Sequence, residues 1–168
     1  VFPSSVHVGS MGGLLALKRG DCHLAPMHLL SEDGDYNIAF LKRFMPGESL
    51  VLICVAEREQ GIVSKTGLDF DAITTHRFIN RQKGSGTRIL LDYMLKERGI
   101  NPDTIQGYSR EVTTHLAVCL AVMSGDADLG MAVHSAAKAY DLPFIPVGTE
   151  RYELVMRADA FESDKRIQ

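Results

Sequence analysis

The sequence predicts an α/β fold in which one chain forms two lobes. Predicted strands alternate with predicted helices along almost the whole chain, which is typical of parallel strand pairing with helical crossovers. A helix end, a Gly-Asp turn and a strand follow one another twice, at residues 17–25 and 122–130, and indicate one such unit in each lobe. Two long runs, around residues 50–63 and 144–156, are placed to cross between the lobes as a two-strand hinge.

Length and composition agree with two small lobes. The chain has 168 residues, of which 45% are hydrophobic and 23% charged, so it can form a core and is not a disordered segment. We expect lobe 1 to comprise residues 1–56 and 150–168 and lobe 2 residues 57–149, each with a mostly parallel sheet flanked by helices. The hinges are expected near residues 54–63 and 146–153.

Charge and cysteine content restrict the partners and the compartment. The net charge of −3 argues against direct nucleic-acid binding. No apolar stretch is long enough to span a membrane. Cys22, Cys54 and Cys119 are scattered without a CxxC pair, and we expect buried thiols in a reducing compartment. The expected location is the cytoplasm, with the periplasm as the alternative if a signal peptide has been removed.

Motifs for catalysis or metal binding are missing from the sequence. It contains neither HExxH nor GxSxG, and the acidic segment 33–37 lacks the later ligands of a calcium loop. The charged segment 57–59 is expected to be solvated. We therefore expect a protein that is not an enzyme and that holds no metal and no cofactor.

The first part of the chain alternates short strands and helices. Ser10 is expected to cap a helix with one apolar face, and Gly20 to end it. The β-branched run that begins at residue 50 is expected to be a central strand. The expected elements are strands at 6–8, 22–25 (broken at Pro26) and 50–56, helices at 10–18 and 38–44, and a loop at 31–36.

The second part repeats this alternation. A helix with inward-facing leucines is expected to end at Gly99. The helix expected at 112–123 is apolar nearly all round, which predicts deep burial. The expected elements are strands at 78–79, 105–108, 128–133, 144–147 and 152–156, and helices at 87–98, 112–123, 135–140 and, as a polar or frayed tail, 159–168.

Segment 80–88 (Asn-Arg-Gln-Lys-Gly-Ser-Gly-Thr-Arg) links a predicted strand to a predicted helix. Small residues at a helix start leave backbone N–H groups uncovered, and these groups bind anions with the help of the helix dipole. Ser85, Gly86 and Thr87 are the candidate ligand-binding residues, with Arg81 raising the local positive potential. The spacing fits neither a P-loop nor a GxGxxG fingerprint. The alternative interpretation is an ordinary flexible turn.

Residues 9–13 (Gly-Ser-Met-Gly-Gly) form a second strand-to-helix junction, which offers Ser10 and Met11 as ligand-binding residues. The alternative for Ser10 is a plain N-cap. Ligand sites in open α/β sheets lie at the carboxyl ends of strands. We therefore expect the two junctions, one on each lobe, to face each other across a cleft.

Two further junctions offer additional candidates. Thr113 and Thr114 lie at the start of a predicted helix, and His134 follows a predicted strand. Each side chain can donate a hydrogen bond to a ligand in the cleft. Helix capping explains the two threonines and the turn at His134 equally well.

Several of these segments combine into a family resemblance. They are 9–14 (GSMGGL), 19–21 (RGD), 28–30 (HLL), 35–37 (DYN), 56–61 (AEREQG), 78–88 (FINRQKGSGTR) and 149–154 (TERYEL). Together they resemble the periplasmic-binding-protein-like domain of the molybdate-binding type, over nearly the whole chain. This domain is found fused to molybdopterin biosynthesis proteins or to helix-turn-helix segments. It is related to type II periplasmic binding proteins and to the effector domains of LysR-type regulators.

The resemblance implies a two-lobed clamp of the type II periplasmic-binding-protein-like fold that closes on a tetrahedral oxyanion, molybdate or tungstate. It implies ligand residues at helix N-termini, here Ser10 in lobe 1 and Ser85, Gly86 and Thr87 in lobe 2, with N–H and hydroxyl donors gripping the anion. The implied role is a receptor or sensor in molybdenum metabolism. The alternatives are the effector domain of a transcription regulator and a cofactor-handling domain of molybdopterin biosynthesis.

The resemblance also concerns the partners and the start of the chain. Besides the oxyanion, the expected partners are a fused or associated DNA-binding or molybdopterin-synthesis domain and a second copy in a homodimer. Members of the family begin with a further strand, a ligand-contacting loop and a helix before the region of residue 6. We therefore expect lobe 1 to lack its N-terminal strand and helix, which either an upstream segment or a partner chain supplies.

Overall fold

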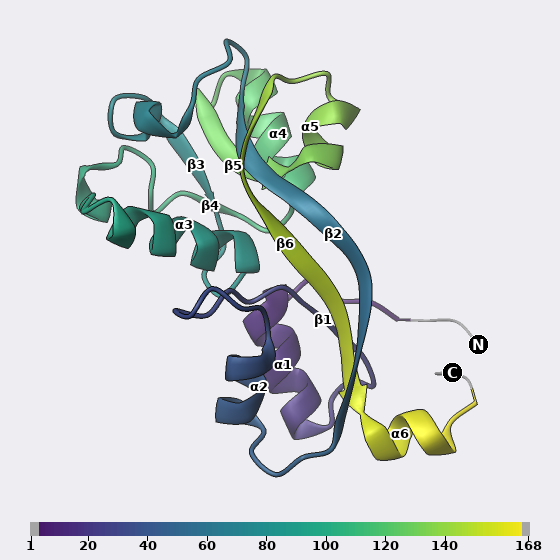
Figure 1. Cartoon of the computed structure of the whole chain (residues 1–168). Helices are drawn as coiled ribbons and strands as arrows, with labels where there is room; N and C mark the ends of the chain where they lie inside the picture. The colour runs from purple at the N-terminus through teal and green to yellow at the C-terminus, as the bar shows by residue number, and fades with distance from the viewer. Residues whose placement is uncertain (1–3, 166–168) are drawn as a thin grey trace.

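One mixed sheet runs through the whole molecule (Figure 1). The computed structural model describes residues 4–165. In this part of the chain the sheet has six strands in the order β1-β6-β2-β5-β3-β4, of which only the pairs β3–β5 and β3–β4 are parallel. The strands are β1 (Ala25–Met27), β2 (Leu50–Ser64), β3 (Phe78–Arg81), β4 (Glu111–Val112), β5 (Leu129–Val133) and β6 (Phe144–Arg157).

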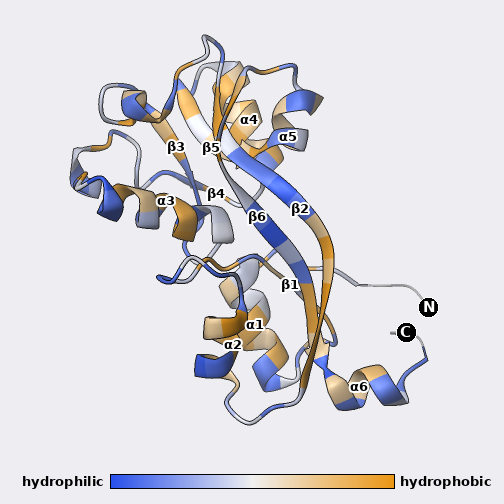
Figure 2. Ribbon diagram, in the orientation of Figure 1, coloured by the Kyte–Doolittle hydropathy of each residue, from blue (hydrophilic) through white to orange (hydrophobic). Residues whose placement is uncertain are grey.

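The long strands β2 and β6 form an antiparallel ribbon that passes from one lobe to the other (Figure 1). The ribbon carries hydrophilic residues in its middle (Figure 2). Register irregularities lie between Cys54 and Ala56 and between Gln60 and Gly61, close to the two ends of this polar stretch of β2. The ribbon therefore enters a core in each lobe and presents polar side chains where it crosses between them.

In the first lobe, α1 (Gly9–Arg19) and α2 (Ile38–Phe44) pack beside β1 and the adjoining halves of β2 and β6 (Figure 1). The left-handed conformation of Gly20, with φ of 78°, ends α1 as its position predicted. The short helix α6 (Ala158–Ser163) follows β6. The buried core of this lobe consists of Leu14, Leu17, Ala25, Met27, Leu29, Leu41, Met45 and Val155.

In the second lobe, α3 (Gly86–Glu97) lies on one side of the sheet and α4 (His115–Ser124) and α5 (His134–Ala139) on the other (Figure 1). Successive side chains of a strand point to opposite faces, so the neighbours Phe78 and Ile79 belong to two different hydrophobic clusters. Two short 3₁₀ helices, Phe70–Thr74 and Pro102–Thr104, lie in the connections around α3.

The predicted α/β fold class with a two-strand hinge is confirmed. Helices α1, α2, α3 and α5 lie within two residues of their predicted bounds. The strands expected at 144–147 and 152–156 are parts of the single strand β6, and the strand expected at 50–56 continues to Ser64. Parallel pairing is confined to the second lobe, because the ribbon strands pair antiparallel with their neighbours.

Some local predictions are wrong. Residues 6–8 are not a strand, and none of the described strands pairs with them. Pro26 does not break its strand but lies within β1 opposite Leu154, where the edge position of β1 tolerates a residue without an N–H. The strand expected at 105–108 is irregular because Gly107 has a φ of 98°, and the pairing occurs instead at β4.

Helix α4 is less buried than its apolar sequence predicted. Val118, Cys119 and Val122 are buried against the sheet, whereas Leu116 and Leu120 are 50% and 54% exposed. The helix therefore has an apolar outer face as well as an apolar inner one. In the described part of the chain, no helix has both the length and the hydropathy that crossing a membrane requires.

Candidate functional site

The two strand-to-helix junctions predicted as ligand sites lie against each other between the lobes. The Met11 N–H, in the first turn of α1, donates to the Gly84 carbonyl at 3.0 Å. A Cβ placed on Gly84 would lie 3.1 Å from the Met11 Cβ, so the two turns are in close contact. The candidate residues from the two lobes therefore occupy one place in the molecule.

The candidate hydroxyl groups are buried and accept hydrogen bonds within the protein. Ser10 Oγ accepts from the His28 N–H at 3.3 Å, although Ser10 is not the N-cap of α1, which is Val8. Ser85 caps α3, and its Oγ accepts from the backbone N–H three residues later at 3.2 Å. Thr87 Oγ1 accepts from Gln60 Nε2 at 3.1 Å. A hydroxyl that accepts still has its own proton, which is the group left to donate to a ligand.

Gly86, in the first turn of α3, makes room for His28. A Cβ at this position would collide with the His28 imidazole and with its carbonyl oxygen. His28 follows β1 in the first lobe, so the two lobes approach each other across this glycine. The absence of a side chain at Gly86, a predicted ligand-binding residue, therefore lets a side chain of the other lobe approach closely.

A set of polar side chains from both lobes and from the ribbon surrounds this contact. We refer to it as the interlobe cluster. It consists of His28, Arg58, Gln60, Arg81, His115 and Glu150.

Glu150, on β6, is the carboxylate of the interlobe cluster, and its side chain is only 2% exposed. Its Oε2 lies 2.6 Å from His28 Nδ1 and 2.5 Å from Gln60 Nε2, and its Oε1 pairs with Arg58. Burial acts to raise the pKa of Glu150, but the His28 hydrogen bond and the nearby His28 and Arg58 charges outweigh it and hold the pKa below its ordinary value. Glu150 is therefore ionised at neutral pH.

Arg81, at the end of β3, is the more deeply buried of the two arginines of the cluster, with 8% of its surface exposed. One guanidinium nitrogen donates to the Thr113 carbonyl at 2.9 Å. Its Nε and second Nη have no hydrogen-bond partner among residues 4–165. Burial lowers the pKa of Arg81 to about 10, with Glu150 opposing this shift and Arg58 adding to it.

Further nitrogen atoms beside Arg81 are also unsatisfied. His115 Nδ1 and Arg58 Nε are buried without a partner within the described chain. Burial lowers the pKa of His115 to about 3, and the charge of Arg81 lowers it further, so the imidazole is neutral at physiological pH. Nitrogen atoms without a partner in the described chain, from β2, β3 and the start of α4, thus gather where the lobes meet.

The charge balance of the interlobe cluster favours a negatively charged ligand. In the described chain, the carboxylate of Glu150 faces two guanidinium groups, those of Arg58 and Arg81, which leaves a surplus of positive charge. A buried cation is costly unless it is paired and hydrogen-bonded, and an anion supplies both. No group of three or more His, Cys, Asp and Glu among residues 4–165 is placed to hold a metal ion.

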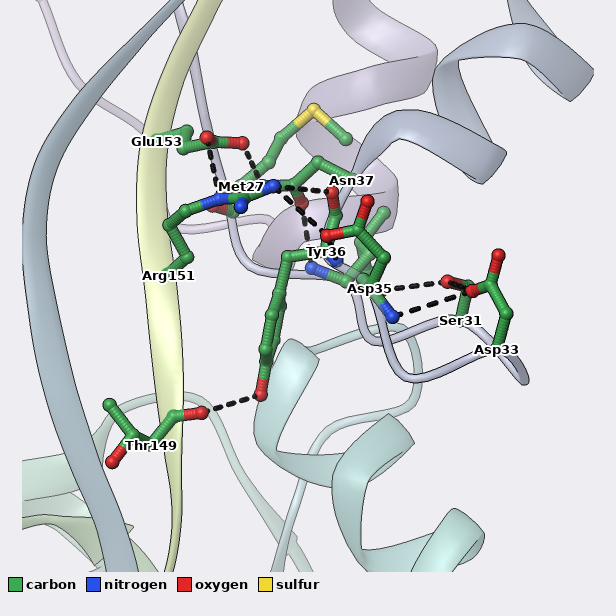
Figure 3. Close-up of polar contacts among 10 residues, drawn as sticks. Met27, Ser31, Asp33, Asp35, Tyr36, Asn37, Thr149, Arg151 and Glu153 are labelled. Carbon is green, nitrogen blue, oxygen red and sulfur yellow. Dashed lines mark hydrogen bonds and ion pairs between the residues drawn. The ribbon is translucent and has the colours of Figure 1, made fainter.

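A loop of the first lobe, which follows His28 in the chain, is bound to β6 by side-chain hydrogen bonds (Figure 3). Asn37 is fully buried in a left-handed conformation, with φ of 65°, and its side chain accepts from the Leu29 N–H at 2.8 Å. Its amide donates to Glu153 Oε2 at 2.7 Å, which ties the loop to β6. The Tyr36 hydroxyl donates to the Thr149 carbonyl at 3.1 Å, next to Glu150. The loop that begins at His28 is therefore anchored to the strand that carries the carboxylate.

The remaining candidates lie around the cluster. Thr113 contributes its carbonyl to Arg81, and Thr114 caps α4 by accepting from the Ala117 N–H at 3.1 Å. His134 lies apart from the buried groups, with its side chain 53% exposed, stacked on Phe144 and 3.3 Å from Glu59. An open hollow of about 270 Å³ lies beside it. The hollow is lined by Glu57, Arg58, Glu59, Val133, His134 and Ser135.

Sequence reasoning missed several residues of the cluster. His28, Gln60, His115 and Glu150 were not predicted as site residues, because they come from separate elements that only the fold brings together. Arg58 was expected in a solvated run, but its side chain is 25% exposed and its guanidinium lies 3.9 Å from the Tyr152 ring centre. The alternation of a strand was the available signal, since Arg58 and Gln60 point to the same face of β2.

The comparisons with known proteins agree with this architecture. A family model described as the PBP superfamily domain matches residues 1–168. The chain belongs to the PBP superfamily. The uncharacterized protein YvgK of Bacillus subtilis (strain 168) is 36% identical over 163 residues, which make up 92% of this chain and 53% of YvgK. This PBP domain therefore spans about half the length of that relative.

Solved structures share the fold of this PBP domain at low sequence identity. The regulatory domain of CcmR from Synechocystis PCC6803, in complex with 2-PG, matches with a TM-score of 0.63 at 13% identity over 89% of this chain and 71% of that one. PhnD1 from Prochlorococcus marinus, in complex with methylphosphonate, matches with a TM-score of 0.64 at 14% identity over 92% and 64%. The fold is thus that of type II periplasmic-binding and LysR substrate-binding-like domains, as the resemblance implied.

Proposed function

We propose that this PBP domain binds a small oxyanion at the interlobe cluster and acts as a receptor or sensor without catalytic activity. The supporting observation is Arg81, a buried guanidinium with two nitrogens unpartnered in the described chain. Arginine binds oxyanions through several charge-assisted hydrogen bonds. The neighbouring nitrogens of Arg58 and His115 that are unpartnered among residues 4–165 come from other elements, which suits a ligand with oxygens in several directions.

The proposed ligand is molybdate or tungstate, with phosphate-like oxyanions as the competing class. A tetrahedral dianion presents four oxygens, and the hydroxyl groups of Ser10, Ser85 and Thr87 lie around the same contact between the lobes as the cluster. The structure of PhnD1 contains methylphosphonate, which is also a tetrahedral oxyanion. The guanidinium groups take the main role in this proposal, and the hydroxyl groups a supporting one.

An attached or associated module is proposed to read out the ligand. CcmR, which shares the fold, is a regulator whose regulatory domain was solved with a small molecule. The length of YvgK beyond the matched part leaves room for a further segment in that relative. A ligand that closes the lobes can shift such a partner only by binding one arrangement of the lobes more tightly than another. DNA-binding and molybdopterin-synthesis modules are the candidate partners, and homodimerisation is a further prediction.

A thermal-shift series with molybdate, tungstate, sulfate, phosphate and methylphosphonate tests the proposed function. A ligand at a hundred times its Kd is expected to stabilise the native state by about 2.7 kcal/mol. The Arg81→Met variant is expected to lose this shift. Arg98→Met, which removes a surface arginine paired with Asp71 in the second lobe, is expected to retain it. Absence of a shift with all five anions in the wild-type protein contradicts the proposal.

A further inference from the structure

Building on the proposed function, we propose that Glu150 is an internal anion that competes with the ligand for the donors of the interlobe cluster. Its carboxylate sets both the affinity of the site and the charge of the anion that the site accepts. The Glu150 carboxylate weakens the binding of doubly charged oxyanions more than that of singly charged ones. The affinity ratio of monoanion to dianion is therefore higher than in the same site without this carboxylate.

The contacts of Glu150 connect groups from both lobes. His28 reaches it from the first lobe at 2.6 Å, and Arg58 and Gln60 reach it from the ribbon. Gln60 Nε2 is also 3.1 Å from Thr87 Oγ1 in the second lobe. The carboxylate therefore already takes three donors that an oxyanion bound at the same place would use.

Glu150 leaves other donors of the cluster unused. Arg81 retains two nitrogens, and His115 one, without a partner in the described part of the chain. The Glu150 carboxylate makes no hydrogen bond to these atoms in the described chain. It therefore satisfies His28, Arg58 and Gln60 but leaves those nitrogens of Arg81 and His115 to a ligand. A ligand is expected to contact Arg81 first and then to compete with Glu150 for Arg58.

The surrounding charges explain the expected selectivity. The ionised Glu150 reduces the positive charge of the interlobe cluster by one, so every negative charge on a ligand meets this carboxylate as well as the cations. A dianion adds a second negative charge beside an ionised, buried Glu150, and like charges repel strongly where water is excluded. The titratable and polar groups that act on Glu150 from the packed elements are His28, Tyr36, Arg58, Gln60, Arg81 and His115.

Glu150→Gln is the main test, because it removes the charge and keeps the shape of the side chain. Calorimetric titrations would compare molybdate, a tetrahedral dianion, with perrhenate, a tetrahedral monoanion of similar size. We expect Glu150→Gln to bind molybdate at least tenfold more tightly than the wild-type protein, with a smaller gain for perrhenate.

The matched control is Glu48→Gln in the first lobe. Glu48 is a carboxylate that also pairs with an arginine, Arg157 at the end of β6, and it takes no part in the interlobe cluster or in the loop that begins at His28. This variant is expected to bind both anions as the wild-type protein does. If Glu150→Gln does not fold, Glu150→Asp serves instead, because its shorter carboxylate retracts from the donors and is expected to raise molybdate affinity to a lesser extent.

The outcomes separate this inference from the proposed function. If the wild-type protein binds molybdate but Glu150→Gln or Glu150→Asp binds it equally or more weakly, the competition is refuted and the anion site stands. If the gain is equal for molybdate and perrhenate, the charge selectivity is refuted. If the wild-type protein and all variants bind neither anion, both the inference and the proposed function are overturned.

Discussion

At the end of β3, Arg81 has two guanidinium nitrogens without a partner in the described chain while only 8% of its surface is exposed. A buried cation in this state lowers the stability of the native fold, and an apolar side chain of similar length removes that cost. The same nitrogens are the proposed contacts to the ligand. Binding and stability therefore place opposite demands on this one residue.

Arg81→Met is expected to raise the free energy of unfolding by about 1–3 kcal/mol, because a desolvated charge is replaced by a flexible apolar chain. Urea denaturation in buffer without oxyanions measures this change. The hydrogen bond to the Thr113 carbonyl is lost in the variant, which reduces the gain. If Arg81→Met is less stable than the wild-type protein, the buried guanidinium stabilises the fold, and the expected stability cost of keeping Arg81 for binding is refuted.

Gly86→Ala is expected to destabilise the protein by about 1–3 kcal/mol, because the added methyl group collides with His28 across the lobe contact. Gly148→Ala is the control, since a Cβ at that position meets nothing within 4 Å. Thermal unfolding of the two variants measures the difference. Equal melting temperatures would show that the lobes do not approach each other at Gly86 in solution.

At the scale of elements, a side-chain pair holds the starts of β3 and β5 together. Asp128 accepts from the Arg77 N–H at 2.9 Å and from two of its guanidinium nitrogens at 3.1 and 2.7 Å. These hydrogen bonds and the Arg77 charge lower the pKa of Asp128 from 3.8 to about 2. The parallel pair that carries Phe78 opposite Leu129 begins directly beside them.

Asp128→Asn is expected to lower the melting temperature at pH 7 and to lose this effect in acid. The pKa of Asp128 is lower in the folded state than its ordinary value of 3.8, so the ionised carboxylate stabilises the fold at every pH above that value. This stabilisation is lost as the pH falls through the folded pKa of about 2. Melting temperatures of both proteins between pH 7 and pH 2 should therefore converge at the acid end. A constant difference across this range rules out the ionised pair as its cause.

The elements that sequence reasoning placed well are those fixed by local chemistry. Gly20 ends α1 and Ser85 caps α3 through contacts within a few residues, and such contacts are visible in the sequence. The strand expected at 105–108 failed because its apolar residues pack into a core while Gly107 turns the backbone. The cluster around Glu150 is still harder to predict, because its donors come from residues 28, 58 and 60.

At the scale of the whole molecule, the three cysteines differ in their exposure to solvent. Cys54 is exposed on the ribbon, Cys22 is half-buried in the first lobe, and Cys119 is buried in the second. Burial raises the pKa of the Cys119 thiol to about 11, which removes its reactive thiolate in the folded state.

A thiol-labelling reagent is therefore expected to modify Cys54 within seconds to minutes and Cys119 only as the protein unfolds. Mass spectrometry of the labelled peptides over time and urea concentration measures this order. If a proposed ligand stabilises the native state, adding it should slow the labelling of Cys119 and leave that of Cys54 unchanged. Rapid labelling of Cys119 without urea shows that the second lobe opens under native conditions.

The ribbon of β2 and β6 also affects how the protein is synthesised. Leu50 pairs with Arg157 and Val63 with Phe144, so the paired residues of the two strands are about eighty or more residues apart in the sequence. Pairings of such large sequence separation form slowly, and a growing chain exposes β2 until its last strand has left the ribosome. During translation we expect the apolar stretch from Leu50 to Val55 to be bound by chaperones, and slowing translation before Phe144 is expected to increase aggregation.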